Sequence, residues 1–121
     1  MDLLESVKQL MRCDIADFDA RCEAYQSSID EIDEEIMGLF VEQMALRLET
    51  LEEAVPAREY GAIKRAAHSI KGMGGTVGYA EASVVAEELE FAAAQEDAVR
   101  CARNVQRLGQ WFEAFRHAYE S

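Results

Sequence analysis

Residues 28–56 read SIDEIDEEIMGLFVEQMALRLETLEEAVP, and this stretch decides the fold class. Ser28, followed three residues later by Glu31, fits a capping box, in which each side chain satisfies a free backbone N–H at a helix start. Apolar residues then recur every three or four positions, at Ile32, Ile36, Phe40, Met44, Leu48, Leu51 and Val55. Pro56 lacks an N–H and ends the pattern. The stretch predicts one amphipathic helix of about seven turns.

Three later stretches have the same helical spacing. The first runs from Tyr60 through Ile63, Ala67 and Ile70 to Gly74, and the glycines at 74, 75 and 78 are expected to end it. Two more helices are expected at roughly residues 80–94 and 97–119. Four amphipathic helices joined by short links predict an all-α, up-down-up-down four-helix bundle over about residues 30–119.

The beginning of the chain is less regular. Residues 3–11 and 14–27 are each expected to form a short helix. We therefore predict one or two extra N-terminal helices within residues 1–29, which cover part of the bundle. The chain has 121 residues, the size of a single domain.

The composition narrows the class of protein. Twelve basic and 24 acidic residues give a formal net charge of −12, which disfavours binding to nucleic acid and to anionic membranes. No apolar run approaches the ~20 residues that a membrane span requires, and MDLLESVKQL at the start has no signal-peptide pattern. The three cysteines are widely spaced, without a CxxC pair, and are expected to be reduced thiols. These features favour a cytoplasmic protein.

One histidine lies among basic residues in this acidic chain. Lys64 and Arg65 precede His68 by one helical turn, and Lys71 follows it by one turn. These cations would offset the negative charge of a phosphoryl group on the imidazole. The same cations would repel a metal ion, and no second His or Cys lies nearby, so no metal site is expected. The pattern favours a phosphoryl acceptor.

Glycines follow the histidine along the same side of the predicted helix. Gly72 lies one turn after His68, and Gly75 lies one further turn along. A glycine in a helix interior costs about 1 kcal/mol of helix propensity, which suggests that a bulky protein partner approaches the imidazole here. The predicted docking face comprises Lys64, Arg65, Met73, Gly75 and Val77.

Residues 68–78, HSIKGMGGTVG, resemble the signature of histidine-containing phosphotransfer (HPt) domains. RAAHSIKG, residues 65–72, is similar to the phosphoacceptor domain of chemotaxis histidine kinases, which belongs to the same family. A long acidic helix before the motif and the Leu89-Glu90 pair after it also match the family. The resemblance covers roughly residues 30–115, and the first 29 residues have no counterpart in the minimal family pattern.

The resemblance implies a role for each matching residue. His68 would be phosphorylated on Nε2, Lys71 would lie beside the phosphate, and Gly72 would keep the ring exposed. Glu90 would accept a hydrogen bond from Nδ1–H and fix the tautomer. The chain would be a phosphotransfer protein without kinase activity or a cofactor of its own.

The expected partners are response-regulator receiver domains, which would supply Mg²⁺, and a hybrid or chemotaxis-like histidine kinase. We predict a phosphorelay intermediate that takes a phosphoryl group from a receiver aspartyl phosphate and passes it to another receiver domain. Two alternatives remain open. The chain could be the phosphoacceptor domain of a chemotaxis-like kinase, or an adaptor that docks a receiver without accepting phosphate.

Overall fold

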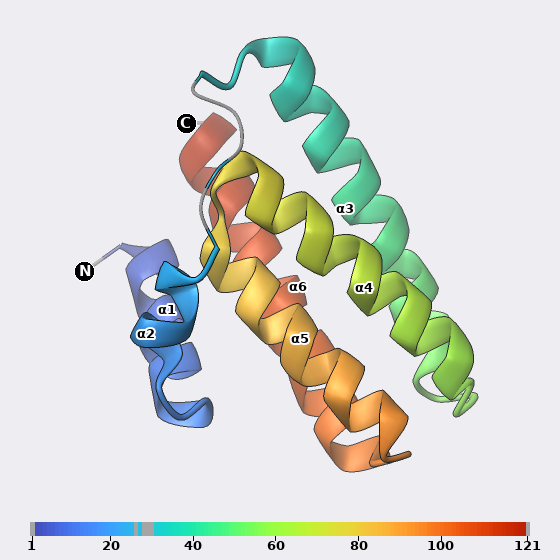
Figure 1. Cartoon of the computed structure of the whole chain (residues 1–121). Coiled ribbons are helices and arrows are strands. Elements are labelled where there is room, and N and C mark those ends of the chain that lie inside the picture. The colour runs from blue at the N-terminus through green and yellow to red at the C-terminus, as the bar shows by residue number, and fades with distance from the viewer. Residues whose placement is uncertain (1, 26, 28–30, 121) are drawn as a thin grey trace.

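The computed structural model describes residues 2–25, 27 and 31–120, and these residues form helices without strands. Figure 1 shows α3, α4, α5 and α6 as long neighbouring rods, with the short α1 and α2 beside α5. The bounds are α1 Leu3–Asp14, α2 Phe18–Glu23, α3 Glu34–Ala54, α4 Tyr60–Val77, α5 Ala80–Ala94 and α6 Ala98–Glu120. The fold is thus the predicted helical bundle with extra N-terminal helices. None of the helices in this described part is long and apolar enough to cross a bilayer.

The long helix α3 begins later than predicted. Ser28 lies outside the described residues, but Glu31 is not helical, so a capping box at this pair does not start the helix. Instead, the Asp33 carboxylate accepts a hydrogen bond from the Ile36 backbone N–H at 2.8 Å. Asp is a preferred N-cap residue, and the two glutamates that follow it interact favourably with the positive end of the helix dipole.

The helix α4 continues through two glycines that were expected to end it. Gly74 and Gly75 are helical, and only Gly78 ends α4, in a left-handed conformation at φ 87°. The N–H of Tyr79 donates to the Gly74 carbonyl at 2.8 Å, and the N–H of Gly78 donates to the Gly75 carbonyl at 3.3 Å. These two bonds form a Schellman motif, which satisfies carbonyl groups at the helix end.

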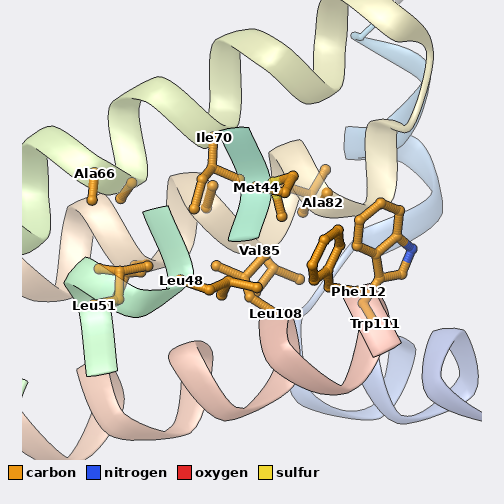
Figure 2. Close-up of a cluster of buried hydrophobic side chains, with 14 of the residues drawn as sticks. Met44, Leu48, Leu51, Ala66, Ile70, Ala82, Val85, Leu108, Trp111 and Phe112 are labelled. Carbon is orange, nitrogen blue, oxygen red and sulfur yellow. The ribbon is translucent and has the colours of Figure 1, made fainter. Parts of the chain in front are cut away.

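The core fills the space between the four long helices (Figure 2). Each helix contributes apolar side chains that are almost fully buried: Met44, Leu48 and Leu51 from α3, Ala66 and Ile70 from α4, Ala82 and Val85 from α5, and Leu108, Trp111 and Phe112 from α6. The rings of Trp111 and Phe115 stack with centroids 5.1 Å apart. This packing fixes the rotation of α4 and α5 about their axes, and therefore which of their side chains face solvent.

The N-terminal helices cover the α5 and α6 side of the bundle. Val7 and Met11 of α1 and Phe18 of α2 are buried in the common core. The second helix is shorter than the expected 14–27, because Ile15 is extended and Asp17 has a left-handed backbone conformation at φ 57°. The N-terminal segment is therefore packed against the bundle along most of its described length.

Two glycines of α4 are expected to respond to alanine with opposite signs. A Cβ at Gly74 would lie 2.5 Å from Ser83 Oγ, so Gly74→Ala forces α4 and α5 apart and should lower the free energy of unfolding by about 1–3 kcal/mol. A Cβ at Gly72 meets nothing within 4 Å, so Gly72→Ala should raise it by about 0.5–1 kcal/mol through helix propensity. Urea unfolding measures both, and equal effects at the two positions would contradict the close approach of α5 to Gly74.

Candidate functional site

His68 projects from the solvent side of α4. Its neighbours Ala66 and Ala67 are buried in the core, and His68 follows them at the edge of this buried face. The His68 side chain is 70 % exposed. A reagent or a protein surface can reach the imidazole without any movement of the bundle.

A carboxylate from α5 holds one nitrogen of this ring. Glu90 follows the buried Leu89, and its Oε2 lies 3.0 Å from His68 Nδ1. Its other oxygen, Oε1, accepts a hydrogen bond from Lys71 Nζ at 2.8 Å. The packing of α4 against α5 thus brings together three residues that the sequence analysis selected.

The charge on Glu90 determines how the ring is held. The hydrogen bond from Lys71 is the largest cause that lowers the pKa of Glu90 below its usual value, and the contact with His68 lowers this pKa further. An ionised carboxylate can only accept hydrogen bonds, so Nδ1 of His68 carries the hydrogen. In the neutral ring, the lone pair is therefore on Nε2, the nitrogen that Glu90 does not contact.

Further cations lie on the same side of α4. Lys64 and Arg65 are exposed, one turn before His68. Arg65 also lines a groove between α3 and α4, together with Arg47 and Ser69. Arg47 lies on α3, so helical spacing within α4 does not predict that it is a neighbour of Arg65.

The two glycines near His68 have different surroundings. Gly72 is exposed, with open space where a side chain would begin. Gly75 is not open, since a Cβ there would lie 3.2 Å from Cδ1 of Tyr25. Gly75 is half-buried beside Tyr25 of the N-terminal segment, and its place on the docking face stays a prediction.

A model of the Hpt domain family matches residues 35–118, well over half of the chain. The chain belongs to the Hpt domain family. Members of this family carry phosphoryl groups on histidine in two-component signalling, without kinase activity of their own, and interact with receiver domains and kinases. No curated protein and no solved structure matches the chain significantly.

An apolar groove lies beside Gly72 in this Hpt domain. It has a volume of about 580 Å³ and is lined by Ile36, Leu39, Phe40, Gln43, Gly72, Met73, Thr76 and Val77. Met73 is half-buried, whereas Val77 is only 7 % exposed. Val77 therefore lies in the wall of the groove, next to Gly72 and Met73, and its contact with a partner stays a prediction.

The α3 side of this groove was not predicted. Leu39 is 59 % exposed, although it is a large apolar residue. It lies next to Phe40 but outside the apolar stripe of α3. A leucine outside the core-facing stripe is a sequence signal that predicts an exposed apolar surface. Elsewhere in the described part of the chain, no cluster of three His, Cys, Asp or Glu side chains could hold a metal ion.

Proposed function

We propose that this Hpt domain is a phosphorelay intermediate, which takes a phosphoryl group from a receiver-domain aspartyl phosphate onto Nε2 of His68 and then passes it to a second receiver domain. The observation that carries the proposal is an exposed imidazole whose Nδ1 lies 3.0 Å from an oxygen of the Glu90 carboxylate. With Nδ1 directed at Glu90, Nε2 is the nitrogen that remains available to attack a phosphoryl group on the partner.

We expect an in-line transfer. The Nε2 lone pair attacks phosphorus, the N–P bond forms, and the P–O bond to the aspartate breaks, so the aspartate leaves as a carboxylate. The ring retains the hydrogen on Nδ1 and gains positive charge, which the Glu90 carboxylate stabilises. The reverse sequence returns the phosphoryl group to another aspartate. Mg²⁺ held by the receiver domain would offset the charge of the transferred group.

We infer that Lys71 assists the phosphorylated state. Its ammonium group is 2.8 Å from Glu90 Oε1, one turn from His68 on the same helix. Rotation about its four side-chain bonds can bring it to the phosphoryl oxygens as a point charge. Lys64 and Arg65 would contribute weaker, solvent-screened attraction from the preceding turn of α4.

A phosphorylated receiver domain tests this function directly. Incubation with the Hpt domain should move the label to the Hpt chain in an acid-labile, base-stable form. The same incubation with the catalytic core of a chemotaxis-like kinase and ATP tests the alternative phosphate donor. If the chain is labelled by the kinase core but not by the receiver domain, it is the phosphoacceptor domain of a kinase and not a relay intermediate. If neither source labels the chain, phosphotransfer by this chain is contradicted.

The surface around Gly72 is expected to be the place where the receiver docks. Gly72→Leu adds bulk where the structure has open space, beside the apolar groove, without loss of helix propensity. We expect the transfer rate to fall by at least about tenfold, the equivalent of 1.4 kcal/mol, while the melting temperature is unchanged or higher.

Gly109→Leu is the matched control for this prediction. Gly109 also has open space at its Cβ position, but it lies on α6 and lines a different groove with Phe112 and Glu113. This variant should transfer phosphate at the wild-type rate. Equal transfer by Gly72→Leu and wild type would count against docking at this face.

A further inference from the structure

The N-terminal segment contacts the same helix that carries Glu90. Arg21 of α2 donates to Glu87 Oε1 at 2.6 Å and also pairs with Glu88. The Tyr25 hydroxyl donates to Glu87 Oε2 at 2.5 Å. Both oxygens of the Glu87 carboxylate are therefore occupied by residues from a segment that the minimal family pattern lacks.

Glu87 and Glu90 lie on one face of α5. They are three residues apart, so their side chains are neighbours on the helix surface. Lys71 acts on both carboxylates: it donates to Glu90, and its charge also helps to lower the pKa of Glu87, for which the hydrogen bond from Tyr25 is the largest cause. Lys71 thus has two acidic groups within its electrostatic range, and only Glu90 is bonded to it.

We propose that Arg21 and Tyr25 are positioning residues for His68. By occupying Glu87 they leave Lys71 to Glu90, and the Glu90 carboxylate, which Lys71 fixes in place, keeps the hydrogen of the imidazole on Nδ1. This proposal rests on the proposed phosphotransfer at His68. It gives the N-terminal segment a role: its residues pair with the Glu87 carboxylate on the acidic face of α5, beside the phosphoacceptor.

The close fit of Tyr25 on α4 supports a fixed arrangement. Its ring lies over Gly75, where a Cβ would approach Cδ1 to 3.2 Å, and the Ser27 hydroxyl donates to the Thr76 carbonyl at 3.0 Å. Gly75, which the sequence analysis assigned to partner docking, provides the space for this ring. The phenol is therefore held on α4 and α5 together, one helical turn beyond Lys71.

The experiment uses the full chain and a double variant, Arg21→Gln with Tyr25→Phe. Phenylalanine keeps the ring on Gly75 and removes only the hydroxyl. Glu87 then loses both partners and competes with Glu90 for Lys71. We expect ¹⁵N NMR to show a smaller fraction of His68 with hydrogen on Nδ1, and the transfer rate from a phosphorylated receiver to fall about fivefold, within the range of couplings in charged networks.

A third change separates positioning from structural support. Glu87→Gln in the double-variant background removes the competing negative charge, so Lys71 should return to Glu90 and both the tautomer signal and the rate should recover. A structural effect of the double variant would not be repaired by a further loss of charge. Failure of Glu87→Gln to restore the tautomer, or a double variant with wild-type tautomer and rate, would overturn the proposal.

Arg107→Gln is the control for general loosening of the N-terminal segment. Arg107 of α6 pairs with Asp14 of α1 at 2.5 Å and has no contact with Glu87. This variant should keep the wild-type tautomer and rate. If the double variant does not fold, Tyr25→Phe alone gives the same comparison with a smaller shift. The tautomer signal needs no phosphate donor, so it remains informative even if His68 proves not to accept phosphate, which would be a failure of the proposed function alone.

Discussion

His68→Gln is expected to abolish the transfer of phosphate to this chain while leaving the fold and receiver binding intact. Glutamine has no nitrogen with an available lone pair that could attack phosphorus, so label on the chain should fall to background. The side chain is 70 % exposed and makes no core contact, so the free energy of unfolding should change by less than about 0.5 kcal/mol. Radiolabel transfer, urea unfolding and calorimetric binding measure the three quantities.

The second histidine provides the control. His117 lies on α6 and is exposed, beside a groove lined by Glu49, Glu52 and Glu113. His117→Gln should transfer phosphate at the wild-type rate. Label that persists on His68→Gln would show that another residue accepts phosphate. Signalling in cells that is undisturbed by His68→Gln, together with intact binding, would favour a docking adaptor over a relay intermediate.

Periodicity was sufficient to predict the four long helices and, in α3, the face that the helix buries. In α3 the apolar spacing from Ile36 to Leu51 describes the side that packs on the core. The start of this helix was predicted wrongly because two local signals competed. Ser28 with Glu31 and Asp33 alone are both plausible caps, and local sequence does not weigh one against the other.

The glycines of α4 illustrate what local sequence cannot show. Gly74 and Gly75 lower the intrinsic helix propensity, yet α4 continues because α5 approaches so closely that Ser83 Oγ occupies the space of a side chain at Gly74. Tertiary packing overrides propensity here. Similarly, nothing near residue 75 in the sequence indicates that Tyr25, far away in the chain, covers Gly75.

The candidate site was more predictable than the surface around it. His68, Lys71 and Gly72 share one helix, so their proximity follows from helical spacing alone. Glu90 was selected by resemblance to the family, and the packing of α5 on α4 brings it to the ring. The contacts of Arg21 and Tyr25 with Glu87 join residues more than 60 positions apart, and no spacing rule reaches that far.

Glu90→Ala is expected to slow phosphotransfer roughly tenfold to hundredfold, the range found when the orienting partner of a metal-ligating histidine is removed. Without the carboxylate, the neutral ring can place its hydrogen on Nε2, and that tautomer has no lone pair toward the partner. Lys71 would also lose its partner. Stopped-flow or quench-flow transfer from a phosphorylated receiver gives the rate, and ¹⁵N NMR gives the tautomer. Glu113→Ala, an exposed glutamate of α6, serves as the control.

Glu90→Gln separates the two functions of this carboxylate. The amide oxygen of glutamine can still accept the hydrogen bond from Nδ1–H, so part of the tautomer preference should be retained, while the side chain loses its charged pairing with Lys71 and is less firmly fixed. We therefore expect a loss of about fivefold, or about 1 kcal/mol, comparable to that of the double variant Arg21→Gln with Tyr25→Phe and smaller than the loss for alanine. If glutamine and alanine slow transfer equally, the charge of Glu90 matters more than its hydrogen bond. The reactivity of His68 would then depend on the pairing of Glu90 with Lys71. Glu87 would be the group that must be kept from competing for Lys71.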